Sequence, residues 1–289
     1  MKPMNTIDTL IKRKSVRSYT RGEVDPSLIK KMINAGNCSK GLYPNIHYKI
    51  TFIEDGKNFY RKLEGLAGYL GKMIDAPHYI IAESSQEEGF LENLGYRFEQ
   101  LIIEAQREGL GTCWIEILQH QEKIKNIIGH KEKNNVILAL TPIGFEMESK
   151  GITKLLKERS VRKDSKETVF MGKWGINIDL QYQHKYIEIL EHARFAPSWA
   201  NQQPWMFIIS DKMLIINVKK DMKYKDAWGN INRIDAGVIM LYISLLASDM
   251  GIKGDWIKPL DINPDSLGIP KEYEPISIFT PYIDSYHLL

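Results

Sequence analysis

The most distinctive stretch of the sequence is APSWANQQPWMF, at residues 196–207. It joins a predicted helix over 186–195 to a predicted strand over 205–210, through a loop that two prolines stiffen. The loop presents a hydroxyl and three amide side chains beside tryptophan rings. Such a surface suits a flat polar ring system, because amides can bind ring edges while apolar groups cover ring faces. The alternative is a packed loop whose polar side chains hydrogen-bond to the backbone.

A second polar stretch, RKSVR, occupies residues 13–17. Two arginines four residues apart, with a serine between them, suit a phosphate group. Guanidinium groups bind phosphate oxygens in pairs, and the hydroxyl adds a neutral donor. The alternative is a solvated basic turn.

The C-terminal part of the sequence repeats the order of the N-terminal part. Three pairs of segments match in the same order: 33–53 with 190–210, GLGTCWI at 109–115 with GIKGDWI at 251–257, and LALTPI at 138–143 with SIFTPY at 277–282. The pattern indicates a divergent duplication in which the second copy has lost residues between matching elements. We expect one fused fold, because no low-complexity linker separates the copies.

The composition excludes several classes of protein. Of 289 residues, 43% are hydrophobic and 26% charged, which is typical of a globular protein and excludes a disordered or collagen-like chain. The net charge of +3 is too small to indicate a nucleic-acid partner. The apolar stretch from Gly237 is too short to cross a bilayer, and the N-terminal segment lacks the apolar core of a signal peptide. With only Cys38 and Cys113, a disulfide framework is excluded, so we expect a cytoplasmic protein with no membrane partner.

RKSVR, KMIDAPHYII at 72–81, GLGTCWI and APSWANQQPWMF together resemble motifs of the nitroreductase family of FMN-dependent oxidoreductases. That family opens with an Arg-x-Ser-x-Arg/Lys element and carries a Pro-Ser-x-x-Asn-x-Gln-Pro-Trp loop after its second main helix. The resemblance implies an α+β fold with a central, mainly antiparallel sheet flanked by helices. It also implies two fused half-copies that mimic the family's dimer.

The order of the motifs departs from the common family pattern. In that pattern the arginine element and the Pro-Ser loop lie in one short subunit, and two subunits share each flavin. Here residues 1–170 hold the arginine element, GLGTCWI and a basic arm, but only a degraded loop, NCSKGLYPN at 37–45. Residues 171–289 hold the intact Pro-Ser loop. The chain is similar to the tandem, single-chain branch of the family (the putative TM nitroreductase type). We therefore expect one flavin-binding unit made from both halves, in a monomer that acts as a pseudo-dimer.

The resemblance implies roles for individual residues of the first half. Arg13 and Ser15 would hold the FMN phosphate, and Arg17 would stabilise the reduced flavin at its N1–C2 edge. Lys72 would donate to the pyrimidine edge, unless it is a solvated helix lysine. The N5 side of the flavin would be lined by Thr112, Cys113, Trp114 and Glu116.

The second half would supply Pro197, Ser198 and Asn201 to the ring and ribityl chain. Gln203 is a weaker candidate ligand, and bracing of the loop is its alternative role. The basic stretch 157–163 resembles the family's C-terminal arm, which would bring Arg162, and second Arg159, to the phosphate. A solvated charged linker is the alternative. No catalytic side chain is expected, since the flavin carries the chemistry. The scattered histidines predict no metal site.

The resemblance implies a two-step reaction. NADH or NADPH would reduce the flavin at N5 and leave, and a small acceptor such as a nitroaromatic or a quinone would then take the electrons. Two alternatives stay open: another flavin reaction (dehalogenation, dehydrogenation or flavin breakdown), and a flavin-binding protein for storage or sensing without turnover. Nucleic-acid binding through the basic stretches is a further alternative, and it predicts salt-sensitive binding.

Overall fold

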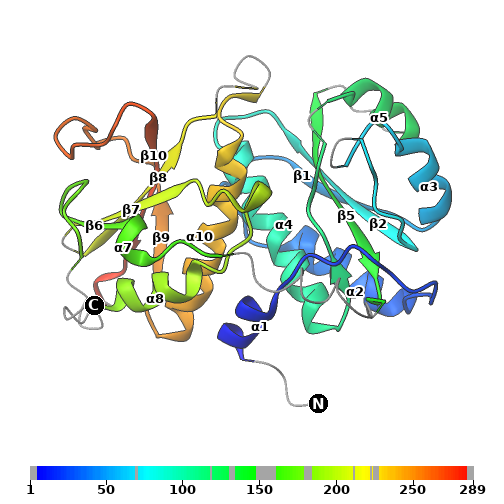
Figure 1. Cartoon of the computed structure of the whole chain (residues 1–289), viewed down its shortest axis with the longest axis horizontal. Coiled ribbons are helices and arrows are strands. Elements are labelled where there is room, and N and C mark those ends of the chain that lie inside the picture. Colours follow the sequence, from blue (N-terminus) through cyan, green and yellow to red (C-terminus); the bar gives the residue numbers. More distant parts are fainter. Residues whose placement is uncertain are drawn as a thin grey trace. The chain divides into compact units, whose positions relative to one another are not determined.

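The computed structural model describes residues 5–68, 71–117, 119–129, 134–147, 161–178, 184–210, 212–221, 223 and 228–284. Contacts between Cα atoms divide the chain into two compact units, each taken by itself below (Figure 1). The first unit contains the described residues from Lys12 to Met147. The second contains Asn5–Ile11 and the described residues from Val161 onward. The division into flavin-binding halves at residue 170 stays a prediction.

An antiparallel sheet organises the first unit. Its helices are α2 (Pro26–Cys38), α3 (Gly56–Leu63), α4 (Phe90–Arg107) and α5 (Gln121–Ile128), and its strands are β1 (Tyr48–Ile53), β2 (His78–Ser85), β3 (Gly111–Thr112), β4 (Ile115–Glu116) and β5 (Asn135–Gly144). The strand order is β1-β2-β5-β3, with β4 also paired to β5, and every pair is antiparallel. Asp25 caps the N-terminus of α2, because its side chain accepts the Ser27 N–H.

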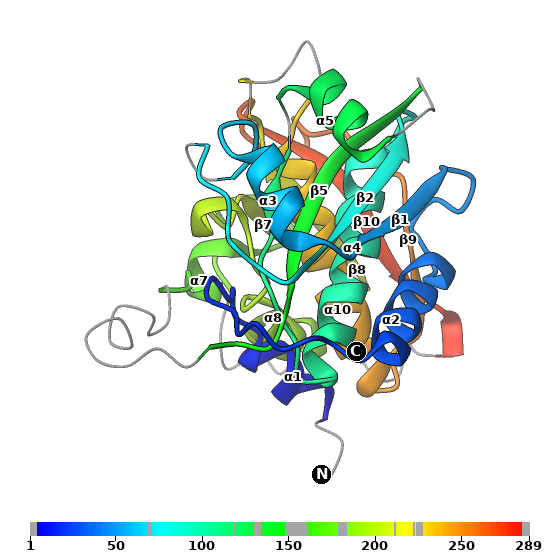
Figure 2. The ribbon, with the colours of Figure 1, turned by 90° about the vertical axis from the view of Figure 1, so that its right-hand side faces the viewer.

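Helices cover both faces of this sheet (Figure 2). Phe59 of α3 packs against Tyr79 and Ile81 of β2, in a cluster that α5 also joins. Ile50 pairs with Ala82, the neighbour of Ile81, and so points to the opposite face. There α2 comes so close that a Cβ on Gly36 would lie 2.3 Å from the Ile50 Cδ1 atom. The sheet is therefore buried on both sides, between α2 and α4 on one face and α3 and α5 on the other.

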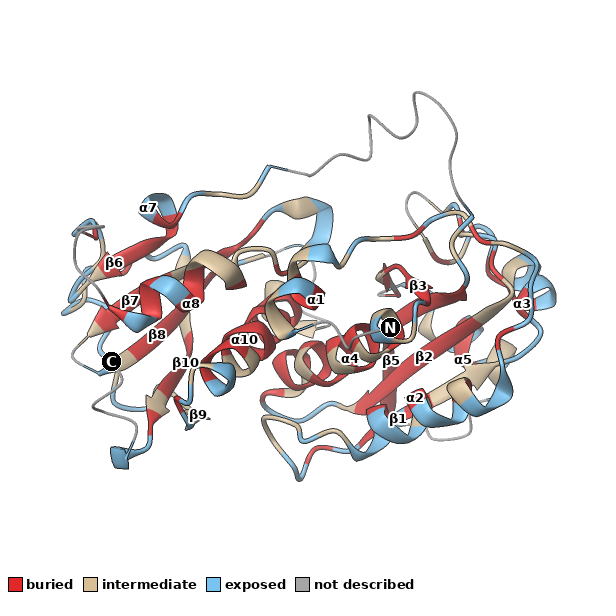
Figure 3. Ribbon diagram, turned by 90° about the horizontal axis from the view of Figure 1, so that it is seen from below, coloured by how far each residue is buried: buried red, intermediate tan, exposed pale blue. Residues whose placement is uncertain are grey.

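The second unit has a sheet of its own. Its elements are α1 (Thr6–Lys12, all but its last residue), α7 (Ser165–Thr168), α8 (Lys185–Ala193), the short 3-10 helix η1 (Trp199–Asn201), α10 (Asn232–Asp249) and strands β6 (Val169–Met171), β7 (Trp205–Ser210), β8 (Met213–Lys219), β9 (Gly254–Ile257) and β10 (Tyr273–Pro281). The strand order is β6-β7-β8-β10-β9, antiparallel except for the parallel pair β6–β7. Figure 3 shows that α10, like α4, is buried along much of its length.

The two units repeat one topology. In the first sheet β1, β2 and β5 lie side by side, and β3 and β4 pair with β5. In the second sheet β7, β8 and β10 lie side by side in the same way, and β9 pairs with β10. Along the chain, a long helix precedes the last strands of each sheet: α4 comes before β3, β4 and β5, and α10 comes before β9 and β10. Each long helix is followed, two residues after its last residue, by a glycine with positive φ, 76° at Gly109 and 78° at Gly251. The next residue in each case donates its N–H to a carbonyl five residues earlier, that of Ala105 or Ala247. The α+β class and the two fused half-copies are thus confirmed, and each copy carries its own mainly antiparallel sheet.

Candidate functional site

In the first unit the arginine segment 13–17 lies along β3. Ser15 and Thr112 form a parallel bridge, and the Val16 N–H donates to the Thr112 carbonyl at 2.8 Å. This approach requires a glycine at position 111, because a Cβ there would lie 2.8 Å from the Val16 Cγ1 atom. The structure therefore brings together two motifs that stand almost 100 residues apart in the sequence.

Arg13 has hydrogen-bond donors that the described residues leave unfilled. Its side chain is 5% exposed, and its Nε and Nη1 atoms are buried without a hydrogen-bond partner among those residues. The Nε atom lies 3.7 Å from the Oε1 atom of Glu99, which is fully buried in α4. Arg17 is exposed. Because buried N–H groups without acceptors cost free energy, this guanidinium is suited to an anion.

Cys113 lies against the same segment. Its N–H donates to the Thr141 Oγ1 atom at 3.0 Å. Burial raises the pKa of the Cys113 thiol, while the charge of Arg17, a hydrogen bond with Ser15 and the charge of Arg13 act in the opposite direction. The raised pKa keeps the thiol protonated at neutral pH, which suits packing and not nucleophilic attack.

The described structure does not test the roles of three predicted residues of the first half and the basic arm. Lys72 is exposed, and no contact links it to the arginine segment among the described residues. Glu116 pairs through its backbone with Ala139, but its side chain is not described. Arg159 lies outside the described residues. Their roles stay predictions.

In the second unit the Pro-Ser loop has a strained backbone. Ala200, Asn201 and Gln203 have φ angles of 47°, 57° and 50°, in the left-handed region that non-glycine residues seldom adopt. Each costs about 1–2 kcal/mol, so the surroundings must hold the loop in place. One support is the Asp235 carboxylate, which accepts the Trp199 N–H at 3.1 and 3.2 Å.

Gln203 holds this loop to residues 161–163. Its side chain accepts from the Lys163 N–H at 2.9 Å and donates to the Asn201 carbonyl at 3.1 Å. Its own N–H donates to the Ser198 Oγ atom at 2.9 Å. Gln203 is 3% exposed, so these bonds are shielded from water. In this structure Gln203 therefore braces the loop, which was the alternative to a contact with the flavin.

Asn201 and Arg162 bind each other. The Arg162 Nη1 atom donates to the Asn201 Oδ1 atom, and its Nη2 atom donates to the Phe195 carbonyl at 3.1 Å. The Asn201 Nδ2 atom donates to the Val161 carbonyl at 2.9 Å. In this structure two residues that the sequence assigned to the flavin therefore stabilise the loop, while Pro197 and Ser198 are partly exposed beside them.

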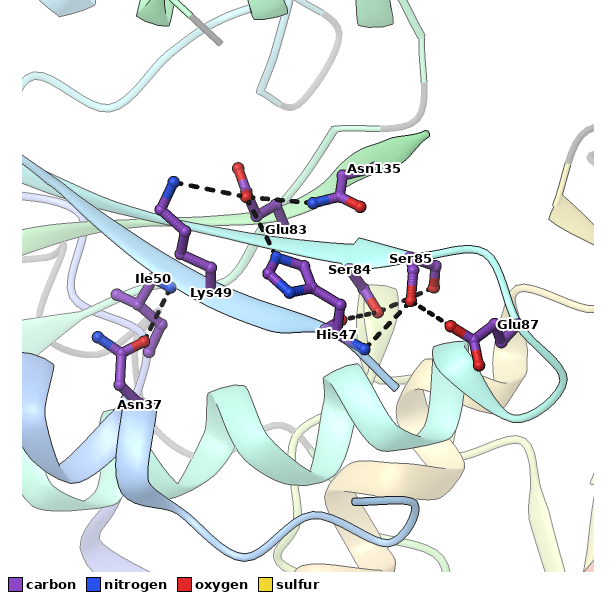
Figure 4. Close-up of polar contacts among 9 residues, drawn as sticks. All are labelled: Asn37, His47, Lys49, Ile50, Glu83, Ser84, Ser85, Glu87 and Asn135. Atoms are coloured by element: carbon purple, nitrogen blue, oxygen red, sulfur yellow. Dashed lines mark hydrogen bonds and ion pairs between the residues drawn. The ribbon is translucent and has the colours of Figure 1, made fainter. Parts of the chain in front are cut away.

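A further buried acidic group of the first unit stands apart from the arginine segment. Glu83 of β2 is 2% exposed and faces the His47 Nε2 atom at 3.7 Å, the Lys49 Nζ atom at 3.8 Å and the Asn135 Nδ2 atom at 3.4 Å (Figure 4). The positive and polar partners of this carboxylate come from the neighbouring segments of the same sheet. The cluster is therefore a structural ion-pair group.

The sequence reasoning missed Glu99 and Asp235. Glu99 lies next to the apolar face of α4 that Phe98 and Ile102 define, and an acidic residue at that position was the available signal. Among the described residues, no group of three or more His, Cys, Asp or Glu side chains could hold a metal ion. In the same part of the chain, no helix has the length and apolar character needed to cross a membrane.

Comparisons with known proteins agree with this architecture. A family model described as "Putative TM nitroreductase" matches residues 5–247. A solved structure described as a putative nitroreductase, from Thermotoga maritima MSB8, is 16% identical with a TM-score of 0.60, over 96% of this chain and 94% of that one. A "Putative NADH dehydrogenase/NAD(P)H nitroreductase" of Methanothermobacter thermautotrophicus is 22% identical over 159 residues, 53% of this chain and 83% of the relative. The solved FMN-dependent nitroreductase of Clostridium difficile R20291 is 19% identical with a TM-score of 0.42, over 55% of this chain and 99% of that one. Because the family model spans most of the sequence, this chain belongs to the TM nitroreductase family, a family of nitroreductase-type oxidoreductases.

Proposed function

We propose that this protein is an FMN-dependent oxidoreductase that passes hydride from NADH or NADPH, through flavin N5, to a small acceptor such as a nitroaromatic or a quinone. The observation that carries the proposal is Arg13. Its buried Nε and Nη1 atoms lack hydrogen-bond partners among the described residues, within the segment that matches the family's phosphate element. Family membership supports the oxidoreductase class, and the name of the curated relative supports a nicotinamide reductant.

The residues of the first unit fit a flavin phosphate. Arg13 supplies charged donors that suit phosphate oxygens, and Ser15 beside it adds a hydroxyl. Arg17 supplies positive charge, which stabilises an anion that forms nearby. When bound, FMN would supply the two-electron chemistry of the reaction. Thr112 and Cys113 are held by β3 and Thr141, so their backbone presents a fixed surface.

The second unit contributes a preformed loop. Its strained backbone is held by Asp235 and Gln203, so little ordering remains when a ligand binds against Pro197 and Ser198. That this loop and Arg13 bind the same flavin is a prediction from the order of the motifs. The stoichiometry of the bound flavin tests it.

The deciding experiment is the visible spectrum of the purified protein, with FMN added during purification. We expect oxidised-flavin bands that NADH or NADPH bleaches without oxygen, and that a nitroaromatic or a quinone restores. Protein that takes up no FMN contradicts the proposal. Bound flavin that neither nicotinamide reduces favours storage, sensing or another flavin reaction. The Arg13→Ala variant is the control, since it should lose flavin during gel filtration.

A further inference from the structure

Glu99 is a buried acidic residue for which the proposed function has no role. We propose that Glu99 is a positioning residue, which orients the Arg13 guanidinium toward the cofactor phosphate and is itself fixed by Trp114. The inference rests on the proposed function and names what prepares its anion site. Three parts of the first unit meet here: α4, the arginine segment and the end of the segment 109–115.

The distance between Glu99 and Arg13 shows that Glu99 can orient the Arg13 guanidinium without using up its hydrogen-bond donors. The Oε1 atom of Glu99 lies 3.7 Å from the Arg13 Nε atom, beyond the range of an N–H···O hydrogen bond. The carboxylate therefore attracts the guanidinium by charge while leaving its Nε and Nη1 donors unfilled. A guanidinium held in this way has lost its rotational freedom before an anion arrives, which lowers the entropic cost of binding.

Glu99 is held in turn from its other oxygen. The Trp114 Nε1 atom donates to the Glu99 Oε2 atom at 2.6 Å. The indole ring stands edge-on to Phe98, with ring centroids 4.8 Å apart. Glu99 and Phe98 are fully buried neighbours on α4. The same helix therefore carries both the carboxylate that accepts from Trp114 and the phenyl ring that packs against the Trp114 indole.

The sign of the electrostatic effect makes the proposal testable. A carboxylate near an anion site repels the anion, so a bystander Glu99 would weaken phosphate binding. A positioning Glu99 strengthens phosphate binding, because a correctly aimed guanidinium gains more than the repulsion costs. Glu99→Gln separates the two cases, since it removes the charge but keeps an oxygen that can accept the Trp114 N–H.

The experiment compares the dissociation constants of FMN and riboflavin, which lacks the phosphate, by flavin fluorescence on the full chain. For Glu99→Gln we expect FMN binding to be about tenfold weaker, because Arg13 is no longer aimed at the phosphate and one charge-assisted contact is weakened. Riboflavin binding should stay unchanged. In the Arg13→Met background, Glu99→Gln should add no further loss, because both changes act on one contact. Glu83→Gln is the matched control: it neutralises a similarly buried carboxylate of the same unit and should change neither constant.

Tighter or unchanged FMN binding by Glu99→Gln overturns the proposal. So does an equal loss of FMN and riboflavin, because that pattern reports a general structural role. If Glu99→Gln does not fold, Glu99→Asp provides the test: it keeps the charge on a shorter side chain and should show the same selective loss of FMN. Equal losses or none there also overturn the inference. A wild-type chain that binds neither flavin contradicts the proposed function itself, which distinguishes the two failures.

Discussion

At the scale of the residue, Gln203 stabilises the Pro-Ser loop through both ends of its side chain. Gln203→Leu removes these bonds and leaves the partly buried Lys163 N–H without its acceptor. We expect a loss of about 2–4 kcal/mol in the free energy of unfolding, the cost of unpaired, partly buried groups in a loop already under strain. Urea unfolding measures it. The neighbouring Gln202 is exposed, so Gln202→Leu should change stability by less than about 0.5 kcal/mol. Equal effects at the two positions would contradict this role of Gln203.

The two cysteines differ in their exposure to solvent, and this should decide how fast each reacts. Cys38 is exposed and Cys113 is buried, and burial raises the pKa of the Cys113 thiol. Because thiolate is the reactive form, we expect one thiol to react quickly with a disulfide reagent at pH 8 and the second only after denaturation. Two fast thiols in the native protein would contradict the buried site.

The raised pKa also links stability to pH. Above the pKa of the unfolded thiol, about 8.5, the native state binds more protons than the unfolded state. The stability that Cys113 contributes is therefore present below about pH 8.5 and is lost as the pH rises toward the native value. As the pH is raised from about 7.5 to about 10, on either side of that pKa, the denaturant midpoint of unfolding should fall more for the wild type than for Cys113→Ala. Parallel curves would show that the thiol titrates alike in both states.

Motifs made of neighbouring residues could be predicted from the sequence, while partners brought in from elsewhere could not. The spacing of Arg13 and Arg17 indicated an anion site, and the structure gives Arg13 unfilled donors. Nothing in the spacing showed that Glu99 would face Arg13, or that Asn201 would bind Arg162. Those pairs form only when separate segments pack.

At the scale of the element, glycines decide where one helix ends. The sequence of residues 57–70 suggests a single helix, but α3 ends at Leu63. Gly65 and Gly68 follow with φ angles of 81° and 89°, which an α-helix cannot contain. Strand β8 was missed, although its sequence MLIINVK is rich in β-branched residues.

Gly109, which precedes β3, and Gly111, its first residue, serve different purposes, and substitution separates them. Gly109 has a positive φ and no atom within 4 Å of an added Cβ, so Gly109→Ala should cost only about 1 kcal/mol. At Gly111 an added Cβ meets Val16, so Gly111→Ala must displace the arginine segment, at about 1–3 kcal/mol. We therefore expect weaker FMN binding from Gly111→Ala alone, measured beside urea unfolding. Wild-type FMN affinity in Gly111→Ala would show that the packing of Val16 on β3 does not position Arg13.

At the scale of the whole molecule, the duplication could be predicted because three matches kept their order. The sequence could not predict to which unit or sheet a short segment belongs. Residues 5–11 belong to the second unit although the arginine segment that follows them belongs to the first. Strand β6 joins β7 in parallel although about 35 residues separate them in the sequence. Local sequence does not state such partners, because long-range packing selects them.

The duplication also predicts how many flavins bind. The first copy has the arginine element but a degraded loop at 37–45, and the second has the intact loop. The segment that precedes α8, residues 173–184, contains no arginine, so the second copy lacks the phosphate element in the equivalent place. Each chain thus holds one complete set of the predicted ligands, and we expect one FMN per chain. The flavin released by denaturation, divided by protein from quantitative amino-acid analysis, measures the ratio. A ratio of two would mean that the degraded loop still supports a site, and that the two copies need not share one flavin.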